Sequence, residues 1–222
     1  MHSIQAFVER QNRMLAADFA DTLSCFVALP AEEFKWRVEF EQWTVCSLPG
    51  CKTSSAIVVR KSPTREPECW ARWNYRDYRR AFSIFLRQYY PQYSITLDSS
   101  VQVDHLEPRF RFSPNANFYI RLHLVDKSVN AGYGAGFERQ FFQSERKKKL
   151  RGPICMSWIA YSKACGRRLP GKNAGKRAWE KWAGERAAEF AFATGEPYER
   201  LLDGFMKMLR LGYTGSYFEL VS

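Results

Sequence analysis

The sequence lacks the features that mark an exported or membrane-spanning protein. Where the apolar core of a secretory signal would lie, it carries Glu9, Arg10 and Arg13. No stretch approaches the roughly 18 uncharged apolar residues of a transmembrane helix. We therefore expect no membrane partner and retention in the reducing cytoplasm, with export by a system that ignores signal peptides as the alternative.

Cysteine is present but irregularly placed. The six cysteines do not have the spacing of a disulfide framework, and a chain of 222 residues is long for one. Cys46, Cys51 and Cys69 would supply three of the four ligands of a zinc site, but the gap within the first pair is wider than the usual two residues. We favour buried, unreactive thiols, so Zn²⁺ is the less favoured metal for this chain.

Disorder and low-complexity structure are also excluded. Hydrophobic residues make up 45% of the chain and aromatic residues 16%, which is enough to build a core. Apolar residues at helical spacing predict a helix from about residue 4 to Pro30, and further helices at about 31–43 and 76–89. Proline and glycine make residues 44–74 irregular, apart from a short strand at 56–59.

The middle of the chain changes from helical to strand periodicity. Residues 94–97 and 101–103 have strand composition, and residues 118–125 alternate between two sides. The last third returns to helical spacing and predicts three helices, at about 154–165, 179–190 and 198–209.

The net charge of +11 is concentrated in one segment. Residues 139–181 hold thirteen Lys or Arg and two Glu, whereas the remainder has 21 basic and 21 acidic residues. Clustered cations gain affinity for a polyanion by releasing counterions, so we expect this segment to contact nucleic acid; a solubilising face or linker is the alternative. The residues predicted to contact nucleic acid are Arg139, Arg146, Lys147, Lys148, Lys149, Arg151, Arg167 and Arg168.

A polar pair ends one of the predicted strands. Asp104 and His105 follow an apolar stretch and precede Pro108, and His105 is one of only three histidines. Taken alone, the pair fits a turn-forming aspartate and a satisfied structural histidine. After the pair come a loop, a second strand, Asn130 and a glycine run that opens a helix.

This order of residues resembles the HNH endonucleases, also called ββα-metal or His-Me finger nucleases, in their Asp-His...Asn variant. The resemblance covers about residues 95–150, roughly a quarter of the chain. It implies that His105 is the general base that activates water, and that Asp104 and Asn130 bind one Mg²⁺ or Mn²⁺ ion. It also implies hydrolysis of phosphodiester bonds, in DNA rather than RNA.

One position departs from the family pattern. Arg121 stands where the family has the middle Asn that braces the histidine loop. We expect either that Arg121 contacts the scissile phosphate as a catalytic residue, or that Asn115 or Asn117 braces the loop instead. The substitution also leaves an alternative function, an inactive HNH-derived protein that binds nucleic acid without cutting it.

The expected fold class is α+β, a predominantly helical chain with a small embedded ββα unit. The regions would be a helical segment at 1–93, the HNH-like core at 94–150 and a basic helical segment at 151–222, together in one compact domain. A third function remains open, a protein-interaction or inhibitor module that uses the basic face and the many aromatic residues on an acidic partner.

Overall fold

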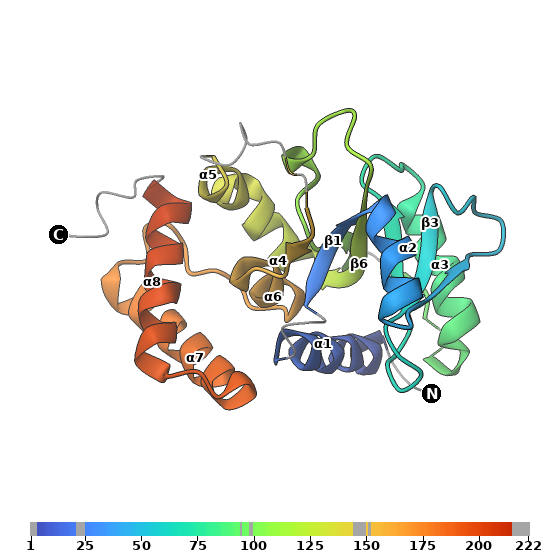
Figure 1. The fold of residues 1–222 in the computed structure, drawn as a ribbon. Coiled ribbons are helices and arrows are strands. Elements are labelled where there is room, and N and C mark those ends of the chain that lie inside the picture. Colours follow the sequence, from blue (N-terminus) through green and yellow to red (C-terminus); the bar gives the residue numbers. More distant parts are fainter. Residues whose placement is uncertain are drawn as a thin grey trace.

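One long strand, β6 (Phe118–Asp126), organises the fold (Figure 1). The computed structural model describes residues 4–20, 25–93, 95–97, 100–143, 150 and 152–214. Eight of the nine residues of β6 are buried, because other elements cover both of its faces. All of its strand neighbours run antiparallel to it.

The strands form a seven-stranded sheet of order β2-β3-β4-β6-β1-β7, in which β5 also pairs with β6. Backbone N–H groups of Ala31 and Leu106 donate to the carbonyls of Asn117 and Arg121, whereas Trp73 N–H donates to Phe118. Carbonyls of successive residues point to opposite edges of a strand, so β1 and β5 follow one another along one edge of β6 and β4 occupies the other. The remaining strands are β1 (Phe26–Pro30), β2 (Thr44–Ser47), β3 (Ala56–Arg60), β4 (Glu68–Arg72), β5 (Val101–His105) and β7 (Ile154–Cys155).

The expectation of a predominantly helical chain with a small ββα unit was wrong. The sheet takes strands from the regions 1–93, 94–150 and 151–222, and β6 lies at its centre. The missed strands are short, two to five residues, so they span too few residues to show alternation. Phe26 continues the helical spacing of the preceding segment, yet it begins β1, and Pro30 ends that strand rather than a helix.

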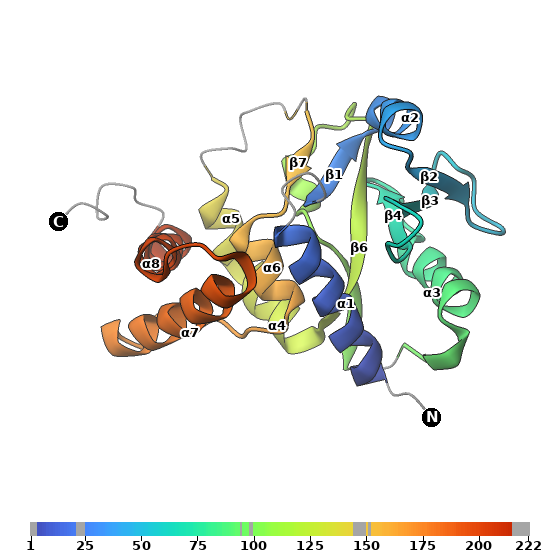
Figure 2. The ribbon, with the colours of Figure 1, turned by 60° about the horizontal axis from the view of Figure 1, so that its bottom comes forward.

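Helices cover the two faces of the sheet. Helix α1 (Ile4–Ala20) lies across β6 on one face (Figure 2). Helix α3 (Tyr78–Tyr89) covers the other, where Phe82, Phe85 and Leu86 pack with Leu122 and Leu124. The short helices of this half are α2 (Ala31–Phe40), η1 (Pro91–Tyr93) and η2 (Arg109–Arg111).

The last third of the chain packs a second helical layer beside the sheet (Figure 1). Ile159, Phe190 and Phe205 form its core together with Val27 and Val125 of the sheet. The helix expected at 154–165 is a short strand followed by a shorter helix, and residues 95–97 are not a strand. The elements after β6 are α4 (Lys127–Gly132), the π-helical turn η3 (Tyr133–Phe137), α5 (Glu138–Phe141), α6 (Trp158–Ala164), α7 (Lys176–Thr194) and α8 (Tyr198–Thr214).

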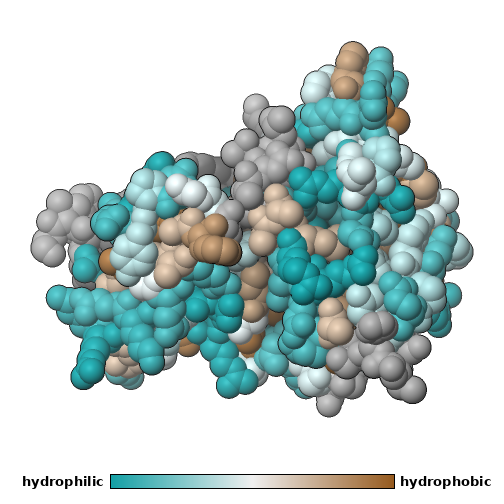
Figure 3. Space-filling model, turned by 90° about the horizontal axis from the view of Figure 1, so that it is seen from below, coloured by the Kyte–Doolittle hydropathy of each residue, from teal (hydrophilic) through white to brown (hydrophobic). Residues whose placement is uncertain are grey.

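None of the helices in the described part of the chain has the length and apolar character needed to cross a membrane. The face on which α1 and α7 lie is mainly hydrophilic, with apolar atoms confined to small patches (Figure 3). These helices therefore turn their apolar sides inward, as amphipathic helices of a folded protein do.

A glycine of α8 sets how closely this helix approaches η3. Replacement of Gly212 by Ala would make the new Cβ clash with the edge of the Phe137 ring. We expect Gly212→Ala to lower the free energy of unfolding by about 1–3 kcal/mol, because overpacking forces a shift. Gly204→Ala in the same helix is the matched control, since nothing lies within 4 Å of its added Cβ. Urea unfolding should show that Gly204→Ala leaves the free energy of unfolding unchanged or raises it by up to about 1 kcal/mol. The same change in free energy for both variants would contradict the close packing of Gly212 and Phe137.

Candidate active site

Asp104 and His105 lie at the end of β5 and Asn130 lies in α4, and β6 connects to α4 directly. In the β5–β6 pairing, Asp104 lies opposite His123 and His105 lies opposite Leu122. Neighbouring residues of a strand project to opposite faces, so the Asp104 and His105 side chains leave β5 on different sides. The strand–strand–helix order implied by the resemblance is thus present, but β6 is the centre of a large sheet rather than part of a separate small unit.

Asp104, His105 and Asn130 line one cleft of about 540 Å³. The cleft opens where β5 ends, between the first turn of α3 and the start of α4. Other polar side chains share its wall: Arg109, Glu138, Arg139 and Lys163. The structure therefore brings together three residues that the sequence separates by up to 26 positions.

His105 forms a buried part of the cleft wall. It is 3% exposed, and its ring centroid lies 4.4 Å from that of Tyr78. Its Nε2 atom has no hydrogen-bond partner among the described residues. Burial lowers the pKa of His105 to about 4, with Arg109 and Lys163 adding to the effect and Asp104 opposing it. The imidazole is therefore neutral at pH 7 and can accept a proton.

A buried lysine holds the two carboxylates of the cleft. Lys163 Nζ, on α6, lies 2.5 Å from Asp104 Oδ2 and 3.0 Å from Glu138 Oε1. Burial lowers the pKa of Lys163, but the two carboxylates outweigh it and raise the pKa above its ordinary value. Burial also raises the pKa of Glu138, and Lys163 offsets only part of that shift.

Asn130 lies inside α4 rather than ahead of it. The helix begins at Lys127, after Asp126 accepts hydrogen bonds from the backbone N–H groups of Ser128 and Val129. Asn130 Nδ2 donates to Gln102 Oε1 at 2.9 Å, which leaves Oδ1 as the amide atom able to bind a cation.

The donor set of the cleft fits a hard divalent cation. It combines the carboxylates of Asp104 and Glu138 with the amide oxygen of Asn130, and Mg²⁺ or Mn²⁺ prefers oxygen ligands of this kind. Within the described residues, no group of three or more His, Cys, Asp or Glu side chains could hold a metal. The zinc site considered for Cys46, Cys51 and Cys69 is therefore not assembled there.

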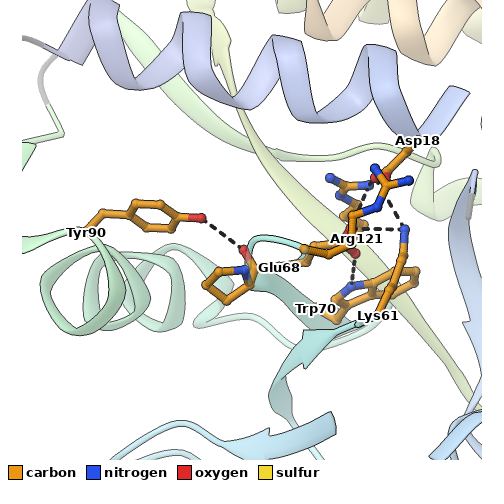
Figure 4. Close-up of polar contacts among 8 residues, drawn as sticks. Asp18, Lys61, Glu68, Trp70, Tyr90 and Arg121 are labelled. Atoms are coloured by element: carbon orange, nitrogen blue, oxygen red, sulfur yellow. Dashed lines mark hydrogen bonds and ion pairs between the residues drawn. The ribbon is translucent and has the colours of Figure 1, made fainter. Parts of the chain in front are cut away.

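Arg121 does not line this cleft. It is 3% exposed and forms ion pairs with Asp18 of α1 and with Glu68 of β4, the latter at 3.1 Å (Figure 4). Lys61 completes the buried cluster, 3.3 Å from Asp18 and 3.0 Å from Glu68. Although burial opposes it, these cations lower the pKa of Asp18. Arg121 thus belongs to a buried structural cluster of charges and not to the cleft that Asp104, His105 and Asn130 line, where its phosphate contact was expected.

His123 lies opposite Asp104 in the strand pairing, but its side chain does not line the cleft. It is 1% exposed, and its Nε2 lies 3.2 Å from Asn12 Oδ1 of α1. Burial lowers its pKa to about 3, with Arg121 adding to the effect.

The predicted basic residues are divided between the cleft and other places. Arg139 is exposed and lines the cleft. Arg167 pairs with Glu189 at 2.8 Å, and Arg168 is exposed on the same loop. Arg146, Lys147, Lys148, Lys149 and Arg151 lie outside the described residues.

Several cleft residues were not predicted as site residues. Tyr78, Arg109, Glu138 and Lys163 come from four other elements or loops. Glu138 follows the motif in sequence, where a solvated helix residue is the ordinary interpretation. Lys163 was counted only as part of the basic segment, and no local pattern distinguishes it from the exposed cations of that segment, such as Arg139 and Arg168.

No protein-family model, curated protein or solved structure matches this chain. The resemblance to HNH nucleases consequently depends on the motif and on the geometry described above.

The buried ion-pair cluster should contribute strongly to stability. Arg121→Met would leave Asp18 and Glu68 with less positive charge, and breaking a buried pair costs about 3–5 kcal/mol. Arg65→Met is the matched control, since this side chain is 33% exposed and lies 3.4 Å from Asp18, so we expect a loss below about 1 kcal/mol. Urea unfolding measures both variants. Similar losses in the two would refute a structural role for Arg121.

The buried neutral histidines should make the fold sensitive to acid. In the unfolded chain a histidine has a pKa of about 6.5, whereas in the fold His105 has a pKa of about 4. The unfolded chain therefore binds more protons between these values, and stability falls as the pH drops from 7 toward 4. Between pH 7 and pH 5, the free energy of unfolding of His105→Gln should fall by about 2 kcal/mol less than that of the wild type, as measured by urea unfolding. Parallel pH curves would show that His105 is charged or exposed.

Proposed function

We propose that this chain is a metal-dependent endonuclease that hydrolyses phosphodiester bonds, in DNA rather than RNA, with His105 as general base. The observation that carries the proposal is the meeting of His105, Asp104 and Asn130 in one cleft, with the Nε2 atom of His105 left without a partner in the described structure. A buried polar atom without a partner is costly unless a ligand or water satisfies it.

His105 would take the proton of the attacking water. Its low pKa of about 4 keeps the imidazole neutral and available at pH 7. An anionic phosphate in the cleft would raise this pKa by favouring the imidazolium, so basicity would increase when substrate binds. The water oxygen would form the new bond to phosphorus as the bond from phosphorus to the leaving oxygen breaks.

Asp104 and Asn130 would hold the divalent cation through their side-chain oxygens. When bound, the cation would supply charge stabilisation at the phosphate and the leaving oxygen. The two ligands come from the end of β5 and the first turns of α4, elements anchored in the sheet. His105 leaves the opposite face of β5 from Asp104, which suits attack from the side opposite the leaving group.

Basic side chains at the rim would position the nucleic acid. Arg109 and Arg139 are exposed and line the cleft. The sequence adds the run of Arg146, Lys147, Lys148 and Lys149 directly after the helix that bears Arg139. Contacts of this kind bind phosphates without reading bases, so we expect little sequence preference from them.

A specific observation favours the second candidate, an HNH-derived protein that binds nucleic acid without cutting it. Lys163 already pairs with Asp104, and His105 is almost fully buried. If neither side chain rearranges when nucleic acid binds, the cleft can recognise phosphate but cannot activate water.

The proposal predicts that binding and cutting separate at His105. With Mg²⁺ present, His105→Ala should lower plasmid nicking by roughly 10²–10⁴-fold, because the general base is lost. DNA binding, measured by fluorescence anisotropy, should change little, since the phosphate-binding cations remain. Arg200→Ala, in an exposed ion pair on α8, serves as the control and should retain both properties. A wild-type protein that binds DNA but never nicks it would support the second candidate instead.

A further inference from the structure

Lys163 occupies a position that a metal ion would suit. Its ammonium lies between Asp104 on β5 and Glu138 on α5, at 2.5 and 3.0 Å from their oxygens. The side chains of Lys163 and Glu138 are 6% and 9% exposed, and that of Asp104 is 22% exposed. The lysine comes from α6, a separate part of the chain, so the sheet and two helices build this contact together.

The charge of this buried group is not balanced. One ammonium contacts both carboxylates, while the other cations of the cleft, Arg109 and Arg139, are exposed, so the contact group itself keeps one uncompensated negative charge. A divalent cation between the same oxygens would carry the missing charge. It would also repel the ammonium, so that the two cations compete for one place.

We propose that Glu138 is a third oxygen ligand of the cation site, and that Lys163 holds Asp104 and Glu138 in place until a divalent cation displaces its ammonium. This inference depends on the metal site of the proposed function. Once displaced, the Lys163 ammonium remains in the cleft, where a substrate phosphate is the available anion. Lys163 is therefore a positioning residue for the carboxylates and a phosphate contact after cation binding.

A purely structural role for Lys163 predicts a different response to its removal. A structural lysine leaves two unpaired buried carboxylates when replaced, and no added ion restores stability. A lysine that stands in for a cation leaves a site that Mn²⁺ can fill. The stability of the variant with and without Mn²⁺ distinguishes the two roles.

Lys163→Met is the first test, with Mn²⁺ as the probe and no nucleic acid present. Without Mn²⁺ the variant should unfold at a lower temperature than the wild type, because its carboxylates lose their partner. Mn²⁺ should raise its unfolding temperature more than that of the wild type and should bind about ten-fold more tightly, measured by calorimetry or electron paramagnetic resonance. Equal Mn²⁺ affinity and equal thermal shift in the two proteins would overturn the inference.

Glu138→Gln tests the ligand assignment independently and decides the matter if Lys163→Met does not fold. We expect Mn²⁺ binding to weaken about ten-fold or more. Glu189→Gln is the matched control, because this carboxylate pairs with Arg167 and Arg186 outside the cleft and should leave Mn²⁺ binding unchanged. Wild-type Mn²⁺ affinity in a folded Glu138→Gln variant would overturn the inference.

These outcomes are separable from those of the nuclease proposal. Mn²⁺ affinity is measured without DNA, whereas nicking is measured with His105→Ala as the negative control. Tight Mn²⁺ binding without nicking would refute the nuclease proposal alone. If nicking depends on His105 but Lys163→Met and Glu138→Gln bind Mn²⁺ as the wild type does, only the roles of Lys163 and Glu138 are refuted.

Discussion

The burial of β6 on both faces is the constraint on which the rest of the structure depends. Every polar side chain on this strand must find a partner from another element, since an unpaired buried charge or amide is costly. Arg121 finds Asp18 on α1 and Glu68 on β4, and His123 finds Asn12. These contacts hold α1 against one face of β6. Strand β5, which carries Asp104 and His105 of the candidate active site, pairs with the same strand and is positioned by it.

The sequence predicts the central elements better than the edges of the sheet. The strand at 118–125 and the last two helices of the chain have enough periodic residues to identify them, and the structure contains them. Strands β1, β2 and β4 have only four or five residues, and β4 combines a buried Glu68 with Trp70. Their pairing is decided by partners far away in the chain, which no local pattern records.

The sequence likewise predicts the motif residues of the candidate site better than the residues that surround them. Asp104, His105 and Asn130 can be selected from sequence because an unusual polar pair follows a strand and an asparagine precedes a glycine run. Lys163 cannot be selected in this way. In the sequence it is one of many cations of the basic segment, and only the folded structure shows that it is buried against Asp104. Arg121 was assigned to the site because it stands where the HNH family has its middle Asn, but strand alternation and the packing of α1 direct its side chain elsewhere.

The two buried charge clusters, around Arg121 and around Lys163, differ in whether their positive and negative charges are balanced. Around Arg121 two carboxylates meet two buried cations, Arg121 and Lys61, and the partly exposed Arg65 also contacts Asp18, so no negative charge is left uncompensated. In the cleft two carboxylates share Lys163 as their single buried cation, beside a neutral histidine with an unpaired nitrogen in the described structure. A balanced cluster gains nothing from a ligand, whereas an unbalanced one beside an open cleft gains electrostatic stabilisation when a cation enters. The imbalance, more than the identity of any one residue, is what supports our proposal of a cation site in this cleft.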